Sequence, residues 1–410
     1  MGVVLNIVGC ESKKIEAQPS IKKVKVTDYT SSVLISSTII PKELYKDKTD
    51  NHNSHQKRKI QKKLNNKDIN VFEKYLQICI LGKSHYSIVY KVKNKLSNKL
   101  RAMKEISKEK IENANDTRNI VFSINVLRNL RHPNIIQLYE FYEDEKNFYL
   151  IYDLCEKIDL NEVLKEKKVL CEFFVKFIMY NILLAVDYLH KQKIIHGDIK
   201  IKNIGFFKKE INNNNNNIDS EDQNINIKEL INEISEDIKL KNEVLIKNNY
   251  ENLSKKAKIF INNLLKYDIK LLDCWSQDVF IKNIIKNNNS DIMLNISYFS
   301  PELFDQNITK ERDEWACGIV MFNLINGYNP FEGDTKEELV DSIINEDIDE
   351  EINELNISKE CKDLLFKLLN KNPHYRIKAE DALKHDFFKK GLKIKDLMNL
   401  NLAIKDFKTI

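Results

Sequence analysis

The chain has 410 residues, 42% of them hydrophobic, with 66 basic and 61 acidic residues. This length and apolar content suit one large or two ordinary globular domains with a buried core. No block of like charge is long enough to suggest a nucleic-acid binder. The seven cysteines form no C-x-x-C pair, which argues against a disulfide framework and a zinc site and indicates a reducing compartment. We therefore expect a cytoplasmic globular protein.

Residues 1–70 mix Lys, Ser and Asn with short apolar pieces, and this composition predicts a disordered N-terminal leader. No window of eighteen apolar residues is found, so neither a membrane span nor a secretory signal is expected. Gly2 follows the first Met and Cys10 lies nearby, but Asn6 stands where the myristoylation pattern prefers Ser or Thr. Acylation with peripheral membrane contact therefore competes with a plain disordered end.

Alternating apolar residues then predict three strands, over residues 76–81, 87–92 and 100–106. A helix-like run follows at 120–130, and a further strand begins at Phe148. Later, residues 208–266 contain six consecutive asparagines and long Asn, Lys and Glu runs. This stretch predicts a low-complexity insertion on an exposed loop, with partial helical period near 227–238.

One octapeptide, residues 196–203, reads H-G-D-I-K-I-K-N and contains Asp198, Lys200 and Asn203. It resembles the catalytic loop H-R-D-x-K-x-x-N of eukaryotic protein kinases. The resemblance implies that Asp198 accepts the proton of a substrate hydroxyl, that Lys200 holds the γ-phosphate and that Asn203 binds magnesium. Gly197 replaces the family's Arg, which implies that a phosphorylated activation loop has no Arg to engage. Some small-molecule kinases also carry H-G-D, so this motif alone leaves the substrate class open.

The strands upstream widen the resemblance. Residues 81–90 resemble the glycine-rich loop over the ATP phosphates, although Ser84 and Ser87 replace two glycines. Residues 101–104, R-A-M-K, resemble the V-A-I-K strand, and residues 148–155 resemble the strand and hinge beside adenine. Together with the catalytic loop, these segments imply ATP contacts at Gly82, Val89, Ala102, Lys104, Asp153, Cys155 and Asn203.

Two segments resemble the family but depart from it. Counting back from the H-P-N-I motif at 132–135 places Ser123 where relatives have the helix Glu that pairs with the strand Lys. In L-D-C-W, Asp273 matches the Asp of D-F-G, which implies Mg²⁺ binding by Asn203 and Asp273. Cys274 and Trp275 replace the Phe and Gly of that motif, which implies a more rigid segment.

The C-terminal third decides the substrate class. It contains S-P-E-L at 300–303, D-E-W-A-C-G at 313–318 and N-G-Y-N-P-F at 326–331, followed by Arg376. Aminoglycoside- and choline-type small-molecule kinases lack this set, so the chain resembles protein kinases, with the calcium-dependent protein kinases as the nearest subgroup. A buried ion pair between Glu302 and Arg376 is expected. No D-x-D-x-D-G loop occurs, so direct calcium sensing is not expected.

The resemblance implies an α+β, bilobal protein kinase fold over about residues 71–388. The expected parts are an N-lobe at about 71–151, a C-lobe at about 156–388 that carries the insertion, and a C-terminal tail at 389–410. It also implies ATP and Mg²⁺ as cofactors and a protein as substrate. Asp159, where basophilic relatives keep an acid, favours a substrate with a basic motif, although an acid at a helix start gives the same pattern.

Two functions remain open from the sequence. The first is a serine/threonine kinase of weak or atypical activity, because all five charged and polar groups that bind Mg-ATP and the substrate are retained: Lys104, Asp198, Lys200, Asn203 and Asp273. The second is a pseudokinase scaffold that binds nucleotide weakly or not at all. It is favoured by the departures Ser84, Ser87, Ser123, Gly197, Cys274, Trp275 and Asn295.

Ser123 gives a direct test of these alternatives. A hydroxyl at this position is too short and uncharged to hold Lys104, so Ser123→Glu should restore the ion pair and raise phosphotransfer several-fold; a tenfold gain would correspond to about 1.4 kcal/mol of barrier. Phosphotransfer from radiolabelled ATP to basic peptides measures the effect. If Ser123→Glu binds Mg-ATP but is as inactive as Asp198→Asn, the scaffold hypothesis is the better account.

Overall fold

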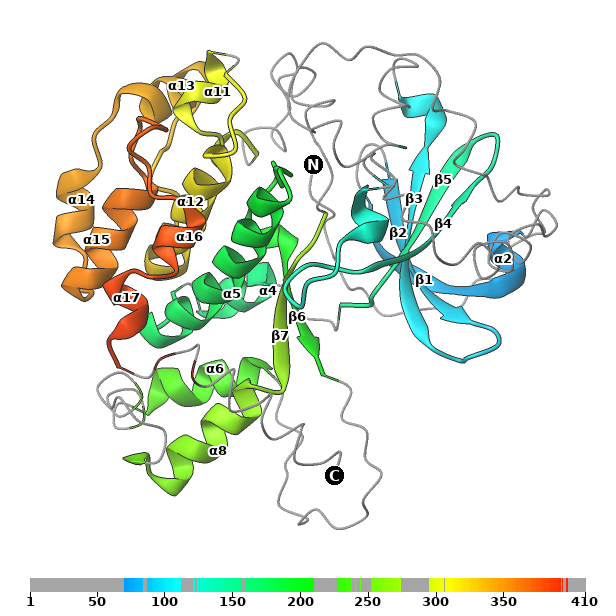
Figure 1. Cartoon of the computed structure of the whole chain (residues 1–410), viewed down its shortest axis with the longest axis horizontal. Helices are drawn as coiled ribbons and strands as arrows, with labels where there is room; N and C mark the ends of the chain where they lie inside the picture. The colour runs from blue at the N-terminus through cyan, green and yellow to red at the C-terminus, as the bar shows by residue number, and fades with distance from the viewer. Residues whose placement is uncertain are drawn as a thin grey trace, which may run out of the picture. The chain divides into compact units, whose positions relative to one another are not determined.

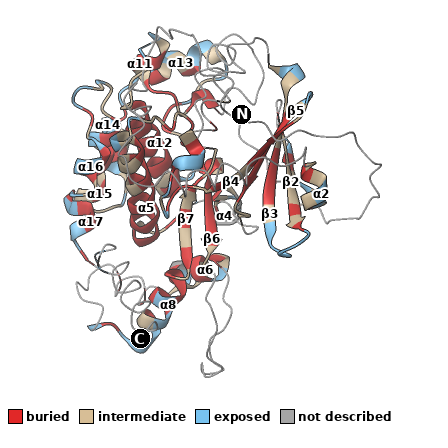
Figure 2. Ribbon diagram, turned by 45° about the vertical axis from the view of Figure 1, so that its right-hand side comes forward, coloured by how far each residue is buried: buried red, intermediate tan, exposed pale blue. Residues whose placement is uncertain are grey.

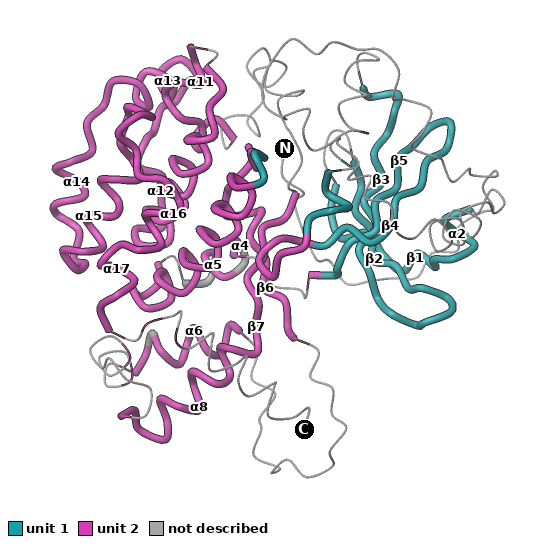
Figure 3. The backbone as a smooth tube through the Cα atoms, viewed as in Figure 1, with its two compact units in different colours: residues 1–130, 137–154, 192–194 teal, residues 131–136, 155–191, 195–410 magenta. Residues whose placement is uncertain are grey.

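The computed structural model describes residues 70–83, 87–111, 121, 124, 126–155, 160–167, 169–209, 227–237, 240, 244, 252–273, 295–305, 307–391, 393 and 396. The chain divides into two compact units (Figure 3), unit 1 with residues 1–130, 137–154 and 192–194, and unit 2 with residues 131–136, 155–191 and 195–410. Several residues of interest from the sequence lie outside the described part: Gly2, Cys10, Ser84, Ser123, Asp159, Cys274 and Trp275.

Unit 1 is built on one antiparallel sheet of five strands in the order β1-β2-β3-β5-β4. The strands are β1 (Tyr75–Lys83), β2 (Ser87–Asn94), β3 (Leu100–Ser107), β4 (Leu138–Glu143) and β5 (Asn147–Tyr152). Short helical turns precede and follow the first three strands, α2 (Val71–Lys74) and η3 (Lys108–Lys110). The three strands predicted from alternating apolar residues are confirmed, each one or more residues longer than its pattern.

The core of unit 1 forms where α2 meets the sheet. Side chains from α2 and from all five strands pack there, and most of them are β-branched or aromatic, the kinds that fit a pleated, half-buried surface. The fully enclosed cluster contains Val71, Tyr75, Val92, Met103, Tyr142, Tyr149 and Ile151. Phe72 packs edge-on against Tyr149, with ring centroids 5.6 Å apart. This cluster fixes the strand register and therefore the positions of the side chains on the opposite face.

Unit 2 is mainly helical and is organised around α5 (Glu172–Lys191), as Figures 1 and 2 show. The other helices are α4 (Leu160–Lys167), α6 (Ile227–Glu236), α8 (Lys255–Leu264), α11 (Pro301–Phe304), α12 (Arg312–Asn326), α13 (Lys336–Asn345), α14 (Asp349–Glu354), α15 (Lys359–Leu368), α16 (Ala379–Ala382) and α17 (Asp386–Lys389). A 3₁₀ turn, η4 (Ile201–Asn203), leads into a two-stranded sheet of β6 (Ile204–Lys208) and β7 (Tyr267–Leu271). The predicted α+β class is confirmed.

Helix α5 is apolar on nearly every side, and fourteen of its twenty residues are buried. Contrary to the sequence expectation, it contains one 18-residue window that is long and apolar enough to cross a membrane by length and composition. That window is 78% buried inside the unit. A helix that is hydrophobic all round is also the pattern of a buried core helix, and the burial of α5 identifies it as one.

The insertion between β6 and β7 differs in character from the predicted exposed loop. Two of its helices are described, and both are amphipathic with apolar faces turned inward. In α6, Ile227, Leu230, Ile231 and Ile234 recur at helical spacing and are each at most 1% exposed. In α8, Phe260 is fully buried, and its ring lies 6.3 Å from the rings of both Phe173 and Phe174 of α5. The helical period near 227–238 was the informative signal, because burial of the apolar face stabilises such a helix.

This packing predicts that the insertion contributes to the stability of unit 2. Phe260→Ala should lower the free energy of unfolding by about 3–5 kcal/mol, the usual cost of removing a buried aromatic ring. The matched control is Ile259→Ala on the same helix, where the side chain is 49% exposed and a change within about 0.5 kcal/mol is expected. Urea unfolding followed by tryptophan fluorescence measures both. Equal, small effects would mean that α8 is a loose appendage.

Candidate active site

Three polar residues predicted from the catalytic-loop motif converge just after α5. Lys200 Nζ donates to Asp198 Oδ1 at 2.8 Å, and Asn203 Nδ2 donates to Asp198 Oδ2 at 2.6 Å and to the Asp198 carbonyl at 2.8 Å. All three side chains are buried, with residue exposures of 8% or less. Because a buried carboxylate is costly unless it is paired and hydrogen-bonded, these contacts fix Asp198 in one orientation.

Asn295 is a fourth member of this cluster. Lys200 Nζ also donates to Asn295 Oδ1 at 2.9 Å, and Asn295 is 6% exposed. The ammonium of Lys200 is therefore held between two oxygens from segments 95 residues apart in the chain. From the sequence, Asn295 counted only as a departure from the family pattern. The structure places it in the polar network of the site.

The backbone of the catalytic loop is held by one buried carboxylate, Asp313 at the start of α12. Its Oδ2 accepts from His196 N at 2.8 Å, and its Oδ1 accepts from Gly197 N at 2.9 Å. His190, at the end of α5, bridges the same helix start, with Nε2 at 2.9 Å from Asp313 Oδ2 and Nδ1 at 3.1 Å from Glu314 Oε1. Helices α5 and α12 thus meet through charged groups directly beneath the loop.

Burial and pairing set the charges in this network. Burial lowers the pKa of His190, but hydrogen bonds to Asp313 and Glu314 outweigh it and raise this pKa to about 10. Burial also raises the pKa of Asp313, yet the His190 hydrogen bond holds it below its usual range. At neutral pH the pair is therefore imidazolium and carboxylate. In contrast, burial lowers the pKa of His196, so His196 is neutral.

The end of β7 returns to the catalytic loop and places Asp273 beside it. Leu272 N donates to Asn203 O at 2.8 Å, and His196 Nε2 donates to Leu272 O at 3.1 Å. Asp273, the next residue, has φ = +52°, an uncommon backbone conformation for a residue other than glycine. Ile204 of β6 lies opposite Leu271 of β7. This pairing brings the chain back to the catalytic loop after the insertion.

Asn203 and Asp273 fit the metal site that the catalytic-loop resemblance implies. The two N–H groups of the Asn203 amide face Asp198 oxygens, which leaves its Oδ1 as the atom suited to a metal. The backbone hydrogen bond from Leu272 N to Asn203 O places Asp273, the next residue in the chain, close to Asn203. Amide and carboxylate oxygens are the ligands that Mg²⁺ prefers.

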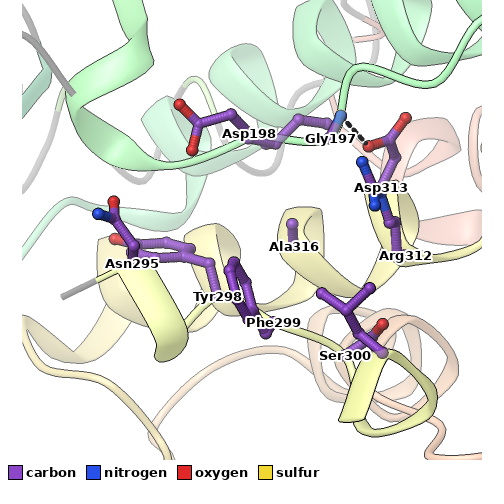
Figure 4. A pocket seen from close by; sticks show the side chains of 11 residues that line it. Gly197, Asp198, Asn295, Tyr298, Phe299, Ser300, Arg312, Asp313 and Ala316 are labelled. Carbon is purple, nitrogen blue, oxygen red and sulfur yellow. Dashed lines mark hydrogen bonds between the residues drawn. The ribbon is translucent and has the colours of Figure 1, made fainter. Parts of the chain in front are cut away.

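A small pocket opens beside this cluster. Figure 4 shows Asp198 and Asn295 on one side of it and Arg312 and Asp313 beside Gly197 on the other. Arg312 is 5% exposed and was not singled out by the sequence. A Cβ on Gly197 would lie 2.1 Å from Arg312 Nη2. Arg312 therefore supplies a guanidinium beside the position where the family has its Arg, and the effect of Gly197 on a phosphorylated activation loop stays a prediction.

The ATP-contact residues predicted for unit 1 share one sheet. In the register of that sheet, Gly82 of β1 pairs with Val89 of β2, and Val89 pairs with Lys104 of β3. Lys104 is 5% exposed and Ala102, two residues before it on the same face of β3, is 9% exposed. Asp153 directly follows β5, and Tyr139 Oη donates to its Oδ1 at 2.7 Å. Their roles in nucleotide binding stay predictions.

Cys155 is the one predicted ATP contact that belongs to unit 2 and is not in the catalytic loop. Its Sγ lies 3.6 Å from Phe206 O, and a Cβ on Gly205 would come within 2.7 Å of the same sulfur. Glycine at 205 therefore makes room for Cys155.

The predicted structural ion pair is confirmed. Arg376 Nη1 donates to Glu302 Oε1 at 2.7 Å, and Nη2 donates to Oε2 at 3.0 Å. This bidentate geometry is the strong form of an Arg–carboxylate contact. It connects the segment after residue 295 to the C-terminal helices of unit 2.

A family model for the protein kinase domain matches residues 75–214 and 280–388. The chain belongs to the protein kinase family. The two matched segments leave out residues 215–279, so the placement of Asp273 depends on the pairing of β6 with β7 and not on the family match. The chain is also 29% identical over 316 residues to calcium-dependent protein kinase 3 of Plasmodium berghei, covering 76% of this chain and 46% of the relative.

A second relative, calcium-dependent protein kinase 5 of Plasmodium falciparum, is 27% identical over 312 residues, covering 76% of this chain and 44% of the relative. The chain thus spans less than half the length of these two relatives. A crystal structure of Rad53 in complex with AMP-PNP aligns with a TM-score of 0.55 at 20% identity, covering 81% of this chain and 70% of that one. This likeness supports the fold.

The charge of His190 predicts a pH-dependent stability. Because its pKa rises from 6.5 to about 10 on folding, its contribution is fully present below about pH 6.5 and is lost as pH rises toward 10. Relative to His190→Gln, the unfolding free energy of wild type should fall by up to about 1.4 kcal/mol per pH unit between pH 7 and 9.5. Urea unfolding at several pH values measures this difference.

The matched control is His374→Gln, which removes an exposed histidine and should leave the pH profile of wild type unchanged. Parallel profiles of wild type and His190→Gln across the same range would show that the imidazolium does not stabilise the start of α12.

Proposed function

We propose that this kinase-family chain is a serine/threonine protein kinase that transfers the γ-phosphate of Mg-ATP to protein hydroxyl groups. The observation that carries the proposal is the buried cluster of Asp198, Lys200 and Asn203, completed by Asn295. A polar cluster buried at this cost is retained where it has a task. The names of the two Plasmodium relatives, both calcium-dependent protein kinases, support the same reaction class.

The number of hydrogen bonds that each side chain can make indicates its role in the proposed reaction. A carboxylate has about four lone-pair sites, so Asp198 can accept a substrate hydroxyl proton while it keeps its bonds to Lys200 and Asn203. An ammonium has three N–H donors; Asp198 and Asn295 take two from Lys200, and the third suits a phosphate oxygen. Mg-ATP, when bound, supplies the phosphoryl group and the metal charge that offsets its oxygens.

A substrate with a basic motif is favoured only by the resemblance at Asp159, which lies outside the described residues, as do the candidate acylation sites Gly2 and Cys10. Calcium dependence is a property of the named relatives. We do not propose that calcium activates this chain.

The rival function is a pseudokinase scaffold, and Ser87 favours it. This residue stands at a glycine position of the family's phosphate loop and is 6% exposed. It lies at the start of β2, opposite Ile106 of β3. Its Cβ restricts positive φ, so the loop has less freedom to approach phosphates. This departure predicts weaker nucleotide binding but leaves the groups around Asp198 in place.

The test is phosphotransfer from radiolabelled ATP to a set of Ser- and Thr-containing basic peptides. Asp198→Asn should lower kcat by about 10²–10⁴, the usual contribution of a general base, while Mg-ATP still raises the melting temperature. The control Asp341→Asn removes an exposed acid on α13 and should match wild type. If the folded wild-type protein is no more active than Asp198→Asn, the scaffold function is favoured.

A further inference from the structure

The residue before Asp198 has no side chain, and a guanidinium from another helix fills that place. Gly197 has φ = +74°, and a Cβ there would lie 2.1 Å from Arg312 Nη2 and 3.2 Å from Arg312 Cζ. Arg312 opens α12, is 5% exposed and lines the pocket beside Asp198 (Figure 4). Residues 197 and 312 therefore share one site, which can hold either a side chain on the loop or the guanidinium.

A glycine at position 197 leaves the backbone before Asp198 with few conformational restraints of its own. Glycine populates more backbone conformations than any other residue, and Gly197 directly precedes the carboxylate on which phosphotransfer is proposed to depend. A displacement of about 1 Å can cost about 100-fold in rate. The loop therefore needs an external restraint on both sides of Gly197. Asp313 supplies one by accepting from the amides of His196 and Gly197.

Arg312 is placed to supply the other restraint. Its planar guanidinium lies against the Gly197 Cα, on the side where a side chain would project. Arg312 is also one of the positive charges, together with the His190 imidazolium, that help to keep the pKa of Asp313 below its usual range. Consecutive residues of α12 thus contact the same turn, one through a hydrogen-bonding carboxylate and one through a packed guanidinium.

We propose that Arg312 is a positioning residue for Asp198, holding the Gly197 turn through contact and charge in place of a side chain at 197. The proposal rests on the proposed phosphotransfer for its catalytic consequence. It does not rest on it for the restraint itself. Arg312 and Gly197 then form one unit, in which a change at either residue disturbs the same turn.

The kinetic test compares five proteins: wild type, Arg312→Ala, Arg312→Lys, Gly197→Ala and the double variant Arg312→Ala/Gly197→Ala. Arg312→Ala should lower kcat at least about tenfold, or about 1.4 kcal/mol of barrier, with KM for ATP within about twofold, because loop geometry and not nucleotide binding is affected. Arg312→Lys should recover part of the loss. The double variant should be no slower than the slower single variant, since both disturb one contact.

Arg376→Lys is the structural comparator. It weakens the bidentate contact with Glu302 and should lower the melting temperature while kcat of the folded protein stays at the wild-type value. If Arg312→Ala behaves in this way, or if the effects of Arg312→Ala and Gly197→Ala multiply, Arg312 is only a core residue and the proposal is overturned.

Hydrogen exchange separates this proposal from the proposed function. In Arg312→Ala, amides in the peptide covering residues 190–203 should exchange at least about tenfold faster than in wild type, whereas Arg376→Lys should leave that peptide unchanged. Unchanged exchange would overturn the restraint, whatever the activity. Faster exchange in a protein that transfers no phosphate would retain the restraint and reject the kinase function.

Discussion

The catalytic loop depends on a buried carboxylate that it does not itself contain. Asp313 is 1% exposed and receives two backbone N–H groups of the loop and the His190 imidazolium. Removing such a charge from water is costly unless every partner is in place. The same contacts that stabilise Asp313 therefore fix the start of the loop, and the position of Asp198 follows from the packing of α5 against α12.

The insertion is compatible with this arrangement because it enters and leaves at adjacent strand ends. Ladder pairs run from Ile204 opposite Leu271 to Lys208 opposite Tyr267, so the chain departs and returns side by side. A longer loop between paired strands adds only a slowly growing entropy cost. Helices α6 and α8 offset part of that cost by burying apolar surface against unit 2. The placement of Asp273 is thus independent of the length of the inserted segment.

Features that depend on residues close together in the sequence were predicted, whereas contacts between residues far apart in the sequence were not. Asp198, Lys200 and Asn203 were found because their spacing within one loop carries the chemistry, and β1, β2 and β3 were found because alternation indicates a half-buried sheet. Arg312 was missed because its partner Gly197 is far away in the sequence, and nothing near either residue reveals the contact. The burial of α8 was obscured by an Asn- and Lys-rich composition, although α6 showed its helical period.

The structure changes how the departures from the family pattern weigh on function. Two of them, Gly197 and Asn295, have compensating contacts: Arg312 fills the space beside the glycine, and the Asn295 amide accepts from Lys200. A site decaying without constraint has no physical reason to keep such complementary pairs, since each buries polar groups at a cost. These two departures therefore no longer favour a scaffold. What still favours one lies in other segments, at Ser84, Ser87, Ser123, Cys274 and Trp275. Substitutions in the phosphate loop, at the position of the acid that pairs with Lys104 in relatives, and directly after Asp273 are therefore the ones that distinguish a kinase from a scaffold.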